Sequence, residues 1–228
     1  MRPFVDHIGN LGLGTEIIYS FFIIICSLMI YYGTKELYEL SSYKGIKYFR
    51  QAFLFFAIAY FFRSFIKVLS LSSDIRDIPE FVPMIFGQAT LFIFVYFSSI
   101  AIFYLLYSVM WKKWNGSSKK VYLFHVISLF IAFLCASARG PFVYVGLNVL
   151  ILLFAGFTFY FANKEQGMRH RKNSLYAIYL LLFAFWMLNV LDVLVPMFLE
   201  MFKLIIYLFS SGIFLLILYK VLKKSGSD

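Results

Sequence analysis

The sequence predicts an all-α fold: a polytopic membrane protein built as a bundle of seven transmembrane helices, with the N-terminus outside and the C-terminus in the cytoplasm. Composition is the first observation behind this prediction. Of 228 residues, 62% are hydrophobic and only 14% are charged, whereas soluble domains hold roughly 45–50% and about 25%. The other two observations are the seven separate hydrophobic stretches and the gathering of Lys and Arg in every second gap between them.

Seven spans account for the whole chain as a single membrane domain, residues 1–228. A bundle of seven spans of about 21 residues needs roughly 147 residues, so little chain is left for a soluble domain. Each stretch is long enough to cross ~30 Å of hydrocarbon as a helix that rises about 1.5 Å per residue. The predicted spans are 15–33, 48–71, 84–110, 121–138, 141–161, 174–195 and 202–221.

The first two spans each have an alternative interpretation. The first has no charge from Ile17 to Thr34 and is similar in this respect to a signal peptide. It lacks a small-residue cleavage site and is followed by Lys35, so we expect it to stay in the protein. The second contains Arg63 and Lys67, and as an interfacial helix it would leave six crossings. Two basic loops would then face opposite sides of the membrane, so we retain seven spans.

The other five spans are marked by charge and proline. The third lies in a stretch from Phe81 to Trp111 that holds no charge, and the fourth is uncharged as well. The fifth begins at Pro141, which suits a first helical turn because its missing N–H group would have no partner there. The sixth ends before Pro196 and the seventh ends near Lys220.

The basic residues predict the orientation. The gaps after the first, third and fifth spans, with the segment after the seventh, hold 15 of the 21 Lys and Arg residues. Since Lys and Arg are retained on the cytoplasmic side, we expect these segments in the cytoplasm and the chain in the cell membrane. Nucleic acid is not an expected partner, because the charges flank the spans and form no single stripe with aromatic residues. The fifteen are Lys35, Lys44, Lys47, Arg50, Lys112, Lys113, Lys119, Lys120, Lys164, Arg169, Arg171, Lys172, Lys220, Lys223 and Lys224.

No motif indicates an enzyme, a cofactor or a metal site. A retinal protein needs a mid-membrane lysine in its last span, but Lys203 and Lys220 lie at the ends of that span. His7 and His170 lie outside the spans, and no HExxH sequence occurs. The two cysteines lie in different spans without the spacing of a disulfide framework or a metal site. We therefore expect a protein that is not an enzyme.

The candidate site consists of polar residues inside the bilayer, which are costly there and usually face the interior of a bundle. Arg63 lies about 10 Å from Ser70 at helical rise, and Asp192 lies at a similar depth on the sixth span. We predict that the two side chains pair, because each charge offsets the cost of burying the other in the low dielectric of the bilayer. Asn189 and Lys67 are expected beside the pair. Gln88 and Asn148 would complete a polar pocket open to the outside, with Glu16, Arg139, Glu200 and Lys203 around its mouth.

Two alternatives to a ligand pocket remain open from the sequence. Arg63 and Asp192 are also consistent with an ion pair that only stabilises the bundle. Arg63 and Lys67 are alternatively long enough to extend unpaired to the headgroups. On the fourth span, His125 is a candidate proton relay, although an ordinary core histidine fits the same position. The spacing of Ser128, Ala132 and Ala136 indicates close helix packing.

The segment from Tyr32 through the basic loop to Arg63 resembles the corresponding part of prokaryotic seven-helix sensor proteins. In the input modules of membrane histidine kinases, a short basic loop likewise follows the first helix. The resemblance covers the bundle plan and about 35 residues, from Tyr32-Gly33-Thr34-Lys35 through Tyr48-Phe49-Arg50 to Arg63. It implies a receptor-like input module. The chain departs from those proteins after Lys223-Lys224, where no kinase or cyclase follows, so we expect output through a partner protein.

Two functional classes follow. The first is a receptor-like module that binds a lipid or small molecule in the outer polar pocket and signals through a cytoplasmic or membrane partner, with membrane lipids around it. The second is a small transporter or channel that uses the same polar residues. An offset of 127 pairs Leu54 with Leu181 and Phe56 with Phe183, which fits a 3+1+3 repeat of some small transporters. The inner half offers few polar residues for a path, which favours binding.

Overall fold

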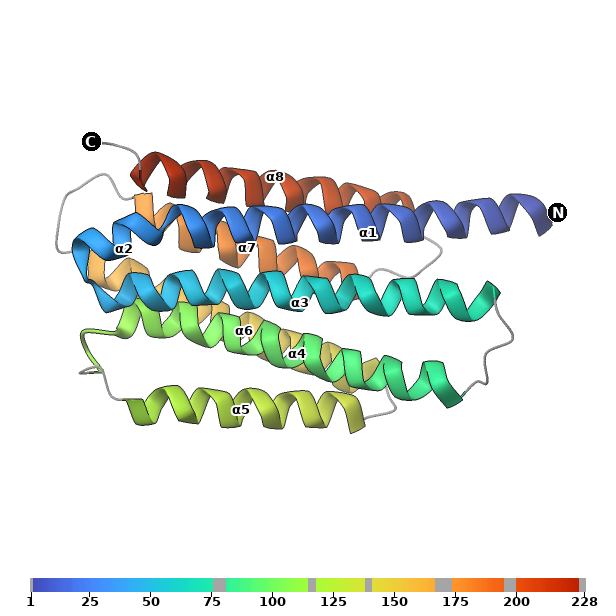
Figure 1. Ribbon diagram of the computed structural model, residues 1–228, viewed down its shortest axis with the longest axis horizontal. Helices are drawn as coiled ribbons and strands as arrows, with labels where there is room; N and C mark the ends of the chain where they lie inside the picture. Colours follow the sequence, from blue (N-terminus) through green and yellow to red (C-terminus); the bar gives the residue numbers. More distant parts are fainter. Residues whose placement is uncertain are drawn as a thin grey trace.

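The computed structural model shows an all-α protein, as the sequence predicts. It describes residues 2–75, 81–114, 118–137, 141–166, 174–194 and 200–225. Within these residues the regular elements are seven long helices and one short helix, arranged lengthwise in one bundle (Figure 1). In chain order they are α1 (Arg2–Gly33), α2 (Lys35–Ser41), α3 (Lys44–Ile75), α4 (Phe81–Met110), α5 (Ser118–Ser137), α6 (Pro141–Gln166), α7 (Ser174–Leu194) and α8 (Glu200–Ser225).

Each of the seven predicted spans lies on one of the long helices, apart from the last residue of the fourth and sixth spans, which lies outside the described residues. The short helix α2 is a difference, because the sequence analysis placed only a loop between the first two spans. Lys35 and Glu39 stand one turn apart in α2, with Nζ 3.7 Å from Oε1, a spacing that supports a helix. The helix ends where Ser42 turns into the left-handed region, at φ 49°.

Six long helices form a closed ring. In order around it, each helix contacts the next: α1, α3, α4, α6, α7, α8 and again α1. Helix α5 lies outside this ring, against α4 and α6 (Figure 1). The centre of the ring is aromatic: Phe53 and Phe56 of α3, Phe185 of α7 and Phe214 of α8 are fully buried and in ring contact. On the predicted packing face of α5, Ser128 and Ala132 are fully buried and Ala136 is half-buried.

Four helices in the described part of the chain are long and apolar enough to cross a membrane, which indicates membrane association. They comprise Gly14–Ser41, Ile85–Met110, Lys119–Ser137 and Met201–Lys223. Helices α6 and α7 hold shorter apolar segments, Val145–Phe161 and Ala177–Asp192. Helix α3 is as long as α1, with 32 residues, but the charges of Arg50, Arg63 and Lys67 interrupt its apolar sequence.

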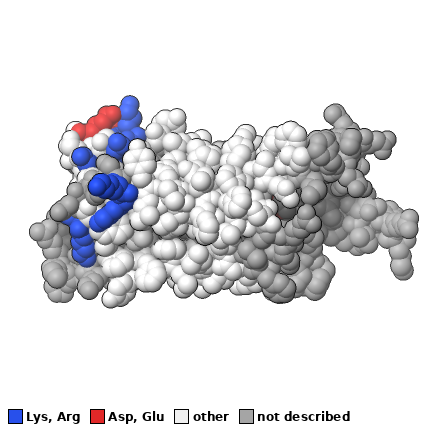
Figure 2. Space-filling model, turned by 90° about the horizontal axis from the view of Figure 1, so that it is seen from below, with Lys and Arg blue, Asp and Glu red and all other residues white. Residues whose placement is uncertain are grey.

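The charged side chains are unevenly placed along the bundle. On the face shown in Figure 2, the described Lys and Arg residues gather at one end, and the middle of the bundle is uncharged. This is the end that carries α2, which we call the α2 end. The opposite end, where the N-terminus lies (Figure 1), we call the N-terminal end. A charge-free middle between two ends is what a surface in contact with hydrocarbon requires.

Candidate functional site

A buried polar cluster lies between α1, α3 and α7, towards the N-terminal end of the bundle. Its centre is the guanidinium of Arg63, whose side chain is only 13% exposed. Arg63 Nη2 lies 2.6 Å from Asp192 Oδ2 and 3.2 Å from Glu16 Oε1. Arg63 Nη1 donates a hydrogen bond of 3.3 Å to Asn189 Oδ1. One arginine therefore joins a carboxylate of α1 to a carboxylate and an amide of α7.

Tyrosines surround this arginine. Tyr60 donates a 2.7 Å hydrogen bond to the same Asn189 oxygen that Arg63 uses, and the Asn189 amide donates to the Phe185 carbonyl at 3.0 Å. The Tyr19 and Tyr60 hydroxyls are 3.4 Å apart. The guanidinium carbon of Arg63 lies 5.9 Å and 5.6 Å from these two ring centres, within the range of cation–π attraction. The cluster thus holds its cation by charge, by hydrogen bonds and by aromatic faces together.

Helix α8 closes the cluster with Tyr207 and Ser210. The Tyr207 ring stacks on that of Tyr19, with centres 4.7 Å apart and planes at 15°, and Tyr207 lies close enough to Asp192 to interact with it electrostatically. Each of the four helices contributes two residues that are three positions apart and so share one face. The four pairs are Glu16 and Tyr19, Tyr60 and Arg63, Asn189 and Asp192, and Tyr207 and Ser210.

The structure brings together three of the residues that the sequence analysis singled out: Arg63, Asp192 and Asn189. Lys67 lies on α3, but its side chain is outside the described residues. The described hydrogen bonds and ion pairs of the cluster come from α1, α3 and α7, whereas Gln88 is exposed on α4 and Asn148 is half-buried on α6. The wider pocket around Gln88 and Asn148 stays a prediction.

The position of Glu16 corrects the sequence analysis. It was expected at the mouth of a pocket, but it lies inside the cluster as the second carboxylate on Arg63. The tyrosines were missed because tyrosines are common in these apolar helices, and composition alone does not indicate which of them form hydrogen bonds with a charged residue. The shared spacing of three between Glu16 and Tyr19, and between Tyr60 and Arg63, is a sign that could have pointed to them.

His125, the candidate proton relay, lies apart from this cluster, between α5 and α4. Both of its ring nitrogens are hydrogen-bonded to tyrosines of α4: Nδ1 to the Tyr96 hydroxyl at 2.7 Å and Nε2 to the Tyr104 hydroxyl at 2.9 Å. A neutral imidazole offers one donor and one acceptor, so one tyrosine donates to it and the other accepts. This geometry ties the outlying helix α5 to the ring. A relay role for His125 stays a prediction.

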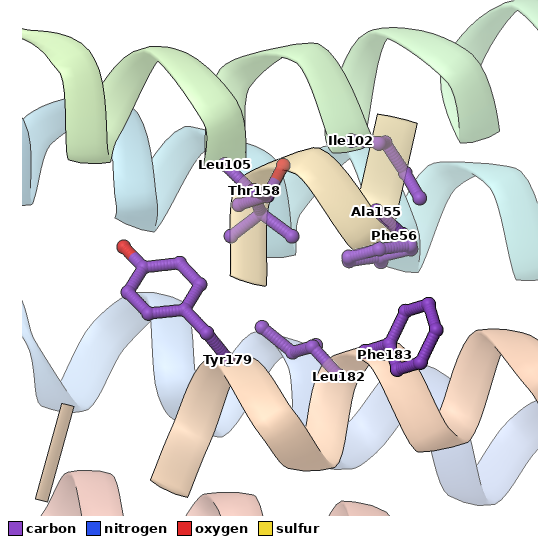
Figure 3. Close-up of a pocket in the computed structure, with 8 residues that line it drawn as sticks. All are labelled: Phe56, Ile102, Leu105, Ala155, Thr158, Tyr179, Leu182 and Phe183. Carbon is purple, nitrogen blue, oxygen red and sulfur yellow. The ribbon is translucent and has the colours of Figure 1, made fainter. Parts of the chain in front are cut away.

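A small cavity lies nearer the α2 end, between α3, α4, α6 and α7 (Figure 3). The space in it that a water molecule can occupy is about 10 Å³, which is about the room for one water. Ser108 donates to the Leu105 carbonyl at 2.7 Å, so the hydrogen bond of 2.8 Å beside the cavity runs from the Tyr179 hydroxyl to Ser108 Oγ. This cavity is too small for an organic ligand. The other residues that line it are Phe56, Ile102, Leu105, Ala155, Thr158, Leu182 and Phe183.

The chain is similar along nearly its whole length to an uncharacterized protein of Archaeoglobus fulgidus. The two are 33% identical over 223 residues, which cover 93% of each chain. No family model matches the chain, and no solved structure matches it significantly.

Proposed function

The chain belongs to one family with the Archaeoglobus fulgidus protein, and we propose that it is a seven-span protein of the cell membrane that binds a small polar molecule at the Arg63 cluster. In this proposal the N-terminus lies outside, the C-terminus lies in the cytoplasm, and the protein acts as a receptor-like module. Its signal passes to a partner protein. The composition of the long helices and the charges at the α2 end support this arrangement, since basic residues are retained in the cytoplasm.

The observation that carries the proposal is that a single guanidinium joins three helices. Arg63 contacts Glu16 of α1 and both Asn189 and Asp192 of α7. A ligand with an ammonium group, a carboxylate or both would compete for these contacts, since its charges match the carboxylates and the guanidinium. Binding would then change the contacts that hold α1, α3 and α7 together. A local change of this kind in charged contacts can shift the equilibrium between two packing arrangements of the helices.

A second contact connects α3 to the α2 end. Arg50 Nε donates to the Tyr31 carbonyl of α1 at 3.1 Å, and its guanidinium carbon lies 4.9 Å and 5.8 Å from the ring centres of Tyr31 and Tyr38. Helices α1 and α3 are therefore linked at Glu16 and Arg63 on one side and at Tyr31 and Arg50 on the other. A displacement of α3 at the cluster would reach α2, whose exposed Leu40 offers a contact for a cytoplasmic partner.

The topology predicts a labelling pattern. Cysteines introduced at Lys44 and Lys119 are expected to resist membrane-impermeant maleimides in intact cells, whereas a cysteine at Gly14 reacts, because the first two positions are cytoplasmic. All three positions are exposed, and the native Cys26 and Cys135 would be replaced by alanine. Permeabilised cells provide the control, since all three should then react. Labelling of Lys44 and Lys119 positions from opposite sides would contradict the proposed crossings.

The binding role predicts a ligand-dependent thermal shift. We expect at least one member of a panel of amino acids and primary amines to raise the unfolding midpoint of the protein in lipid nanodiscs. Tyr60→Phe, which keeps the ring and removes the hydroxyl that donates to Asn189, should weaken that shift, and Tyr122→Phe, at an exposed tyrosine of α5, should not. Equal shifts in both variants would place the ligand elsewhere.

The second candidate function is a small transporter, which the packing order favours. The ring consists of two triples of consecutive long helices, α1, α3, α4 and α6, α7, α8, with α5 between them in sequence and outside them in space. Each contact within one triple has a counterpart in the other, as a parallel repeat requires. Saturable uptake of the stabilising solute by proteoliposomes would assign this function, and binding without uptake supports the receptor-like module.

A further inference from the structure

Lysines of three neighbouring segments at the α2 end each lie over an aromatic ring, within the range of cation–π attraction. The distances from Nζ to the ring centre are 5.4 Å for Lys44 and Trp111, 5.6 Å for Lys112 and Tyr43, and 4.9 Å for Lys120 and Trp114. Lys44 belongs to α3, Lys112 to the turn after α4 and Lys120 to α5. We call these residues the ring-held lysines.

The two tryptophans under them are anchored in the core of the bundle. The rings of Trp111 and Trp114 both contact the ring of Tyr107, with centres 5.4 Å and 5.6 Å away. The Trp114 ring also lies 5.7 Å from that of Phe124. Tyr107 and Phe124 are buried, whereas the two tryptophans are half-buried. Contacts with the core therefore fix the positions of the tryptophans, and the tryptophans fix those of the lysines over them.

The ring-held lysines lie where apolar segments end. The apolar segment Ile85–Met110 ends directly before Trp111, and the segment Lys119–Ser137 begins directly before Lys120. In a membrane, the end of an apolar helical segment marks the boundary between hydrocarbon and headgroups, and tryptophan prefers the same layer. These lysines and their rings therefore lie at the depth of the lipid phosphates.

Few carboxylates lie at the α2 end among the side chains that the structure describes. They are Glu36 and Glu39, both on α2, and Glu39 Oε1 lies 3.7 Å from Lys35 Nζ. No described ion pair involves a ring-held lysine. An aromatic face attracts an ammonium group without neutralising its charge, so these lysines keep N–H groups that can donate to an anion. Figure 2 shows the gathering of basic side chains at this end.

We infer that the ring-held lysines, with Trp111 and Trp114, form a surface that binds the headgroups of acidic phospholipids in the cytoplasmic leaflet. Lysine binds phosphate as a point charge, and each lysine near a membrane surface strengthens binding to acidic lipid roughly fivefold. The apolar body of an indole ring suits the upper part of the acyl chains. A lipid fits this surface better than free phosphate does, because phosphate alone would use the charges and leave the rings without a partner.

This inference rests on the proposed membrane crossings, which place the α2 end at the cytoplasmic leaflet, and it does not depend on a ligand at Arg63. Tryptophan fluorescence of the full chain in nanodiscs tests it, using lipids with brominated acyl chains as quenchers. The third tryptophan, Trp186, is 4% exposed inside the bundle, so the quenching should come mainly from Trp111 and Trp114. At constant ionic strength, phosphatidylglycerol is expected to occupy the quenching position about tenfold more strongly than phosphatidylcholine, given roughly fivefold for each lysine.

Substitution of the lysines tests whether the rings matter. Lys44→Gln, Lys112→Gln and Lys120→Gln together should reduce the preference for phosphatidylglycerol to less than about twofold, since roughly fivefold is lost with each lysine. If this variant does not fold, the adjacent single changes Lys120→Gln and Lys119→Gln decide. The first should lower the preference about fivefold and the second by less than about twofold.

The matched control removes the same charge from the same end. Lys35→Gln, Lys47→Gln and Lys119→Gln together change three exposed lysines for which no ring contact is described, and this variant should keep most of the preference. An equal loss in both triple variants would overturn the inference in favour of diffuse surface charge. Equal quenching of the wild type by both lipids would overturn it as well.

Two further arms separate this surface from the other proposals. Soluble glycerol phosphate should leave the preference of the wild type unchanged, and its removal of the preference would assign the lysines to free phosphate instead of lipid. The nanodiscs carry phosphatidylglycerol in both leaflets and contain no amine or amino acid. Neither a failed ligand search nor an inverted orientation therefore affects this result, and the labelling pattern above tests the crossings by itself.

Discussion

Arg63→Ala is expected to lower the free energy of unfolding by about 3–5 kcal/mol, the range for removing one partner of a buried ion pair. The side chains of Asp192 and Glu16 are 8% and 13% exposed, so their carboxylates would be left in low dielectric without the guanidinium. The hydrogen bond from Arg63 to Asn189 would be lost as well. Denaturant unfolding in mixed micelles measures the change. Lys47→Ala, at an exposed basic residue of the same helix, should change the value by less than about 0.5 kcal/mol.

A double-mutant cycle separates a true pair from two independent losses. Asp192→Asn should also destabilise the protein, but the variant that carries both changes should be no less stable than Arg63→Ala alone, since the asparagine no longer brings an unpaired charge. Coupled residues in contact show interaction energies of about 0.5–3 kcal/mol. If the two effects simply add, Arg63 and Asp192 do not stabilise each other, and the charges extend separately towards the headgroups.

Gly45→Ala is expected to destabilise the protein by about 1–3 kcal/mol, the usual cost of overpacking. Gly45 is buried near the start of α3 at the α2 end. A Cβ atom there would meet the Tyr43 ring and would lie 2.9 Å from the Ser108 carbonyl oxygen of α4. Backbone cannot move aside as the end of a side chain can, so α3 and α4 would have to separate. Thermal unfolding in nanodiscs measures the loss.

Gly212→Ala is the matched control for this steric effect. It is also a helical glycine, on α8, but a Cβ atom there would have nothing within 4 Å. Alanine loses less conformational freedom than glycine on folding, so this change should raise stability by about 0.5–1 kcal/mol. Opposite signs for the two substitutions are the expected result. A loss of similar size at both positions would mean that the close approach of α3 to Ser108 does not matter.

The helices could be predicted from the sequence because each consists of a long apolar stretch with charge or proline at its ends. Pro141 marks the first residue of α6, as expected. Helix α2 escaped prediction because seven residues are too few to show a period. The order of the helices around the ring escaped it too: all long helices are apolar on nearly every face, so no stripe of residues says which neighbour each one contacts.

Part of the cluster could also be predicted, because a charge in an apolar stretch needs a partner and the chain offers few. Arg63 and Asp192 follow from that argument. Glu16 could not be assigned to the cluster in this way, because it stands at the predicted end of its span, where a solvated carboxylate is equally reasonable. Tyr19 and Tyr207 could not be assigned either, because their roles depend on the placement of α1 against α8. That placement is a property of the packed bundle and cannot be read from one segment of the sequence.

The position of α5 has a consequence for the ion pair. This helix takes no place in the ring, yet it carries the chain back along the length of the bundle, so α6 starts from the same end as α1 (Figure 1). Helices α3 and α7 therefore run in the same direction, and Tyr60 with Asn189 and Arg63 with Asp192 meet at one level. Without α5 an odd number of passages, those of α1, α3 and α4, would precede α6. The second triple would then run upside down, and Asp192 would lie at the opposite end of the bundle from Arg63. The outlying helix α5 therefore decides whether Arg63 and Asp192 lie at the same level of the bundle and can pair.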